Sequence, residues 1–74
     1  MKNLIGKNVM LFCLNYIYAG KLIAVDDENV QLENASIVYE TGELKNKSFK
    51  DAQPLPNTWF IKTSCVESFG ISGR

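Results

Sequence analysis

Residues 18–35 carry the pattern that most restricts the fold of this chain. An apolar segment ends at Val25, residues 26–29 are polar, and residues 30–33 alternate between apolar and polar side chains. A period of two is typical of a half-buried β-strand. The polar break favours a tight turn, because short acidic and amide side chains bond the local backbone. The stretch therefore predicts a strand, an acidic turn and a second strand.

Two places in this stretch predict strong curvature. Gly20 lies inside the first strand, where a residue without a side chain usually marks a bend or a close approach of two backbone segments. In the second strand the apolar residues change from even to odd positions near Glu33 and Asn34. This change indicates a β-bulge, because one inserted residue lets both sets face one core. A long bent strand is what a small, highly curved barrel requires.

Strands are expected at five places in the chain. The first strand, residues 7–14, is apolar at six consecutive positions, which predicts that both of its faces are buried. One face would lie in the core of the sheet, and the other would be covered by another element or by another copy of the chain. The other expected strands cover residues 17–25, 30–40, 58–63 and 65–69. Residues 43–57 are polar, contain Pro54 and Pro56, and are expected to form an exposed loop. The fold class predicted is all-β, a small SH3-like or OB-like barrel with little or no helix at the N-terminus.

The length of the chain restricts how such a fold is stabilised. Its 74 residues form one domain, residues 1–74, and a domain of this size is only marginally stable alone. Disulfides, metal ions or partner subunits usually supply the additional stability that such a small domain needs. The chain has no histidine and only two cysteines, which is a poor ligand set for a metal. We therefore expect oligomerisation, and neither a metal nor another cofactor.

The two cysteines, Cys13 and Cys65, admit two interpretations. They could form one disulfide, or they could remain thiols that pack as small hydrophobic side chains. Both lie in apolar runs, which favours free thiols in a reducing compartment such as the cytoplasm. The longest apolar run, residues 9–14, is too short to cross a membrane, so no membrane partner is expected.

The charge of the chain argues against a strong electrostatic grip on duplex DNA. Eight basic and eight acidic residues give a net charge of zero, whereas binding to duplex DNA needs a basic face. A small local site for a single strand of nucleic acid is compatible with this balance.

The order of these residues resembles the Sm and Sm-like family, which includes the bacterial Hfq type. The first block of that family has a glycine, a leucine, a hydrophobe and an aspartate before a turn, and an asparagine, a hydrophobe, a leucine and an alanine after it. The matching residues are Gly20, Leu22, Val25, Asp26, Asn29, Val30, Leu32 and Ala35. The second block resembles residues 61–69, and the variable segment between the blocks corresponds to residues 43–57.

The resemblance implies a strongly bent five-stranded barrel that assembles into a homo-oligomeric ring. In the family the fourth strand of one protomer pairs with the fifth strand of the next, and this pairing covers open sheet edges. It also implies that single-stranded RNA, or DNA, binds at the pore through two turns of each protomer. The corresponding residues here are Asp26, Glu28, Asn29, Lys62 and Thr63.

The chemistry of these positions leaves two functions open. An asparagine amide offers a donor and an acceptor to a base edge, and a lysine attracts phosphate. Glu28 cannot stack on a base, however, and with Asp26 and Asp27 it would concentrate negative charge at a pore. The alternative is the same ring as a structural or protein-interaction module without a nucleic-acid site. Neither function is enzymatic, because no histidine is present as a base for a cysteine or serine.

Overall fold

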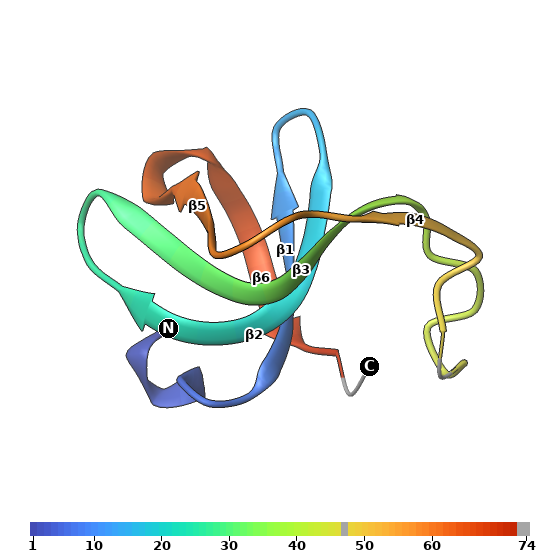
Figure 1. Ribbon diagram of the computed structural model, residues 1–74, viewed down its shortest axis with the longest axis horizontal. Helices are drawn as coiled ribbons and strands as arrows, with labels where there is room; N and C mark the ends of the chain where they lie inside the picture. Colours follow the sequence, from blue (N-terminus) through green and yellow to red (C-terminus); the bar gives the residue numbers. More distant parts are fainter. Residues whose placement is uncertain (47, 73–74) are drawn as a thin grey trace.

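The computed structural model describes residues 1–46 and 48–72, which form an all-β domain (Figure 1). Six strands make one antiparallel sheet, and short 3-10 turns precede the first and the last strand. The elements are η1 (Lys2–Leu4), β1 (Asn8–Cys13), β2 (Ile17–Val25), β3 (Asn29–Glu40), β4 (Asp51–Pro54), β5 (Trp59–Lys62), η2 (Thr63–Cys65) and β6 (Val66–Ile71). Within the described ranges no helix has the length and apolar character needed to span a membrane.

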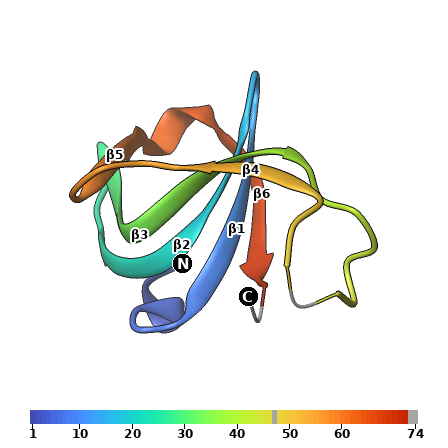
Figure 2. The same ribbon diagram turned by 45° about the vertical axis from the view of Figure 1, so that its right-hand side comes forward.

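The sheet is organised around β3, which pairs with three strands. β2 lies along one edge of β3, while β5 and β4 follow one another along the other edge (Figure 2). β1 pairs with β2, and β6 pairs with β1. Among the described residues no pairing joins β6 to β4 or β5, so the curved sheet does not close. The expectation of five strands in a barrel is corrected accordingly: the all-β class is confirmed, with six strands in an open sheet.

β3 contains a β-bulge, a feature that bends a strand. Opposite Gly20, β3 carries one more residue than β2, and Asn34 there has a φ of 52°, a left-handed conformation that asparagine tolerates. A Cβ atom on Gly20 would lie 3.0 Å from the Cα atom of Ala35 and 3.1 Å from the carbonyl oxygen of Glu33. Both predictions, the bulge and the close backbone approach, are confirmed.

The hydrophobic core consists of two clusters of buried side chains. The larger comprises Val9, Leu11, Leu22, Val30, Leu32, Ala35 and Ile61. The smaller comprises Met10, Ala19 and Val38, with Phe49 and Ala52 packed against it. Because successive residues of β1 contribute to different clusters, β1 is buried on both faces, as its apolar run predicts. The cover of the second face comes from the same chain.

Residues 43–57 are not the continuous exposed loop that their polar sequence predicts. Asp51–Pro54 form β4 and pair with β3. Phe49 and Ala52 pack against the smaller cluster, and Leu55 packs against the larger one. Within this segment, Asp51–Pro54 therefore belong to the sheet, while most of the other described residues are exposed, as their polar sequence predicts.

Candidate functional site

The five residues singled out in the sequence come together where two turns meet, at the left of Figure 1. Asp26 and Glu28 lie in the turn between β2 and β3, and Asn29 is the first residue of β3. Lys62 ends β5, and Thr63 begins η2. Asn29 and Lys62 are register partners in the β3–β5 ladder. The structure thus places all five predicted positions at one end of the sheet.

Asp26 determines the shape of the first turn. Its Oδ1 atom accepts hydrogen bonds from the backbone N–H groups of Glu28 and Asn29, both at 2.8 Å. The backbone N–H of Asp26 donates to the carbonyl of Asn29 at 3.0 Å. The bonds from Asn29 and then Glu28 lower the pKa of the Asp26 carboxyl, because they stabilise its charged form. Asp26 is therefore an ionised residue that orients the turn.

Thr63 joins the two turns directly. Its hydroxyl donates to the backbone carbonyl of Asp26 at 2.9 Å, and its N–H donates to the carbonyl of Glu28 at 2.9 Å. The second of these bonds joins two backbone groups, so the distance between the turns does not depend on a side chain alone. Lys62 is consequently held next to the acidic tip.

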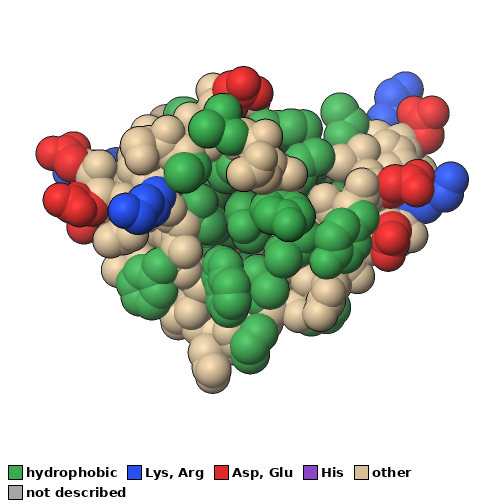
Figure 3. Space-filling model, turned by 90° about the horizontal axis from the view of Figure 1, so that it is seen from above, with side chains coloured by type: hydrophobic (Ala, Val, Ile, Leu, Met, Phe, Trp, Pro, Cys, Tyr) green, Lys and Arg blue, Asp and Glu red, His purple; other side chains and the backbone are tan. Residues whose placement is uncertain are grey.

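An apolar hollow lies beside the two turns. Its volume is about 210 Å³, and its lining includes Tyr16, Phe60, Lys62 and both cysteines. Phe60 is 57% exposed and Tyr16 is 51% exposed. Figure 3 shows apolar side chains gathered over the centre of this face of the molecule, with charged side chains toward its two ends.

Sequence reasoning missed Phe60 as a surface residue. It interpreted residues 59–61 as the apolar centre of a strand, whereas Trp59 is half-buried, Phe60 exposed and Ile61 buried. The available signal is the alternation of a strand: if Ile61 faces the core, Phe60 and Lys62 share the outer face. An exposed aromatic ring and a lysine therefore lie on the same side of β5.

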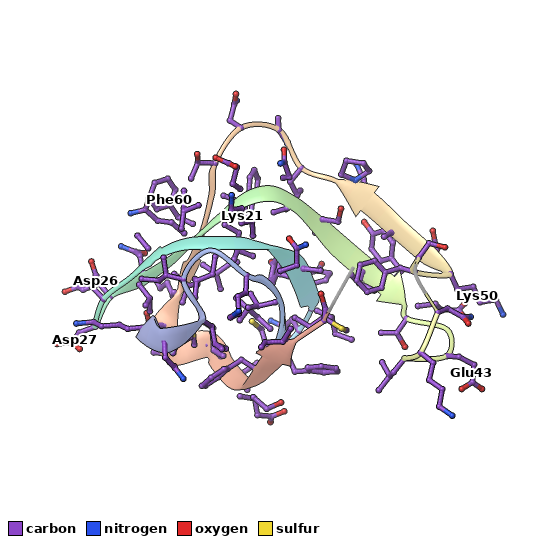
Figure 4. The ribbon with its side chains drawn as sticks, turned by 90° about the horizontal axis from the view of Figure 1, so that it is seen from below. Lys21, Asp26, Asp27, Glu43, Lys50 and Phe60 are labelled. Carbon is purple, nitrogen blue, oxygen red and sulfur yellow. The ribbon has the colours of Figure 1, made fainter. Side chains whose placement is uncertain are left out.

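The charges at this end of the sheet are mixed. Asp26 and Asp27 project from the hairpin tip (Figure 4), and Glu28 and Lys62 are exposed beside them. In the described part of the chain, neither the amide of Asn29 nor the ammonium of Lys62 has a hydrogen-bond or ion-pair partner. These two groups are available to a ligand, next to three carboxylates.

Three strands of the sheet have an open edge. Within residues 1–46 and 48–72, β4 and β5 pair only with β3, and β6 pairs only with β1. Such edges present unpaired N–H and C=O groups to another strand. On β6 the exposed side chains Phe69 and Ile71 lie beside the open edge.

No protein-family model matches the chain, and no curated protein matches it. Across the described residues, no group of three or more cysteine, aspartate or glutamate side chains is placed to hold a metal ion. A function has to be inferred from the two joined turns, the hollow and the open edges.

Proposed function

We propose that the protein is an Sm-like, ring-forming protein that binds single-stranded RNA, or single-stranded DNA, without catalysing a reaction. The observation that carries the proposal is the junction of the two turns, where Asn29 and Lys62 are register partners and Thr63 bonds to Asp26. The amide of Asn29 can donate to and accept from a base edge, and the ammonium of Lys62 can attract a phosphate. Repeated once in each subunit, such a junction would line a pore.

The open edges of the sheet support assembly into a ring. The edge of β5 in one copy would pair with the edge of β6 in the next, which continues the sheet from subunit to subunit. The same contact would cover exposed apolar side chains on both strands, including Phe60 and Phe69. Each weak contact to a nucleic acid would then be multiplied by avidity.

A second function is favoured by the carboxylates at the hairpin tip. Asp26, Asp27 and Glu28 form the tip, and two lysines, Lys62 and Lys2, lie near it. In a ring the three carboxylates would be repeated around the pore and would repel phosphate. The ring would then be a structural or protein-interaction module without a nucleic-acid site.

Native mass spectrometry with and without a short uridine-rich RNA, at near-physiological salt, tests both functions. A ring that takes up RNA is the expected result. A ring that stays empty with several single-stranded oligonucleotides would favour the interaction module. A monomer at all concentrations would contradict the ring itself.

The variant Lys62→Ala tests the residue assignment. It should weaken RNA binding and lower the salt dependence of the affinity, because one phosphate contact per subunit is lost, while the mass of the ring stays the same. Lys50→Ala is the matched control, since Lys50 is exposed at the opposite end of the molecule (Figure 4). An affinity of Lys62→Ala equal to that of Lys50→Ala would remove Lys62 from the site.

A further inference from the structure

Two thiols that the proposed function does not use line the same hollow. Cys13 ends β1 and Cys65 ends η2; both are free and half-buried. Both contribute to the hollow of about 210 Å³ beside Lys62. They are the two cysteines of the chain, so a disulfide within one chain can join only this pair.

The β1–β6 ladder brings the two residues close together. Cys13 is the register partner of Val66, the residue that follows Cys65. Cα atoms of register partners in an antiparallel pair are about 4.5–5.5 Å apart, and a disulfide joins Cα atoms about 4.4–6.8 Å apart. The Cα atom of Cys65, next to the register partner of Cys13, is therefore expected near the range of Cα–Cα distances that a disulfide joins.

The turn before β6 allows both cysteines to line the same hollow. In a regular strand Cys65 would point to the opposite face from Val66, which packs against the core. Cys65 instead belongs to η2, and the ladder shifts its register between Phe12 and Cys13. These irregularities account for the presence of both cysteines in the lining of one hollow.

The titration of neighbouring groups agrees with this proximity. Burial raises the pKa of the Cys13 thiol, and the nearby Cys65 raises it further. The pKa of Tyr18 is raised by burial first and then by its neighbours, which include both cysteines. These directions agree with the placement of both thiols and Tyr18 in the lining of one hollow.

We propose that Cys13 and Cys65 form a reversible dithiol–disulfide pair within one chain, oxidised by a small-molecule disulfide such as oxidised glutathione. Cys65 loses a proton and attacks one sulfur atom of the oxidant, forming a mixed disulfide and releasing one glutathione thiolate. Cys13 then loses a proton, attacks the Cys65 sulfur and releases the second glutathione thiolate. Two cysteines are oxidised, one small disulfide is reduced, and the two protons end on the two released thiolates.

Burial and the nearby Cys65 raise the pKa of Cys13, which disfavours its thiolate, so we assign Cys13 to the second attack. Closure ties the end of β1 to η2, which begins at Thr63 and directly follows Lys62. The link would therefore stiffen the side of the hollow next to the two turns.

Intact-mass analysis tests the proposal. The folded protein is incubated with oxidised glutathione, quenched in acid, and then alkylated with N-ethylmaleimide in denaturant. We expect a monomer that has lost two hydrogen atoms, carries neither alkyl groups nor glutathione, and regains both alkylation sites after dithiothreitol. The same incubation in concentrated urea should give mostly glutathione adducts, because the unfolded chain does not hold the thiols together.

Two variants serve as controls, and their readout, the mass of the chain, is informative whether or not the variants fold. Cys13→Ser and Cys65→Ser each retain one thiol, and each should give an alkylated or glutathionylated chain and never the mass of the closed disulfide. Two alkylated or two glutathionylated thiols on the folded wild-type chain would overturn the proposal. Disulfide-linked dimers on a non-reducing denaturing gel, or equal closure in urea, would overturn it as well.

Discussion

Replacing Gly20 by alanine should destabilise the fold, because the added methyl group has no room at the bulge of β3. Its carbon would lie 3.0 Å from the Cα atom of Ala35 and 3.1 Å from the carbonyl oxygen of Glu33, inside the usual contact distance of about 3.5–4.0 Å. Both obstacles are backbone atoms, so relief requires β2 and β3 to separate locally. Overpacking costs about 1–3 kcal/mol, and the smaller conformational freedom of alanine in the unfolded chain offsets about 0.4–1 kcal/mol. The difference between these two ranges centres on a net loss of about 1–2 kcal/mol, which is the loss we expect.

Gly70→Ala is the matched control. Gly70 also lies in a strand, β6, but a Cβ atom there would meet nothing within 4 Å. Unfolding can be followed through the fluorescence of Trp59, the one tryptophan of the chain, at one fixed protein concentration, because association would add to the apparent stability. The expected loss lowers the Tm by roughly 4–16 °C. A Gly20→Ala protein as stable as Gly70→Ala would refute the steric reasoning.

Three further predictions concern the core and the two turns. Leu32→Ala should lower the free energy of unfolding, measured in urea, by about 2–5 kcal/mol, because Leu32 is fully buried. Leu14→Ala is the control and should change it by less than about 0.5 kcal/mol, because Leu14 is 72% exposed. Equal losses would contradict the assignment of the core. Thr63→Val removes the hydroxyl that donates to the Asp26 carbonyl and should lower the free energy of unfolding by about 0.5–1.5 kcal/mol. Thr63→Ser keeps a hydroxyl and should retain most of this stability, and the same urea titration measures both variants. The pKa of Asp26 is lowered by folding, so its contribution to stability is present at neutral pH and is lost as the pH falls from the usual aspartate range through the lowered value. Asp26→Asn should therefore show a smaller loss of stability in acid than the wild type, and an identical acid profile would count against the carboxylate as the acceptor of the turn.

The first half of the fold could be predicted closely because its strands carry strong patterns. The predicted bounds of β2, residues 17–25, agree with the structure, and the phase change in β3 correctly predicted the bulge at Asn34. β4 could not be predicted, since Ala52 is the one apolar residue besides proline in its four positions. Pro54 also argued for a loop, yet it ends an edge strand, where a missing N–H is tolerated. Pairing with β3 and packing of Ala52, both tertiary effects, make this segment a strand.

The candidate site could be predicted in its residues and less well in its connections. The hydrogen bond between Thr63 and Asp26 spans 37 positions of the chain, and no local pattern reports a contact of that kind. Cys65 was expected to begin the last strand, but it lies in η2, which turns it into the hollow lined by Phe60. The role of these residues in binding a nucleic acid stays a prediction.

β1 and β6 are neighbours in the sheet although they lie near opposite ends of the described chain. Val9 pairs with Ile71, and the N–H of Ser72 donates to the carbonyl of Asn8 at 2.9 Å. During synthesis, β1, β2 and β3 can pair as soon as they emerge, because each hairpin closes only a short loop. The outer edge of β1 has no partner until β6 is made. The nascent sheet therefore exposes the edge of β1 to other chains until β6 pairs with it, and the open edge of β6, with Phe69 and Ile71 beside it, then takes its place.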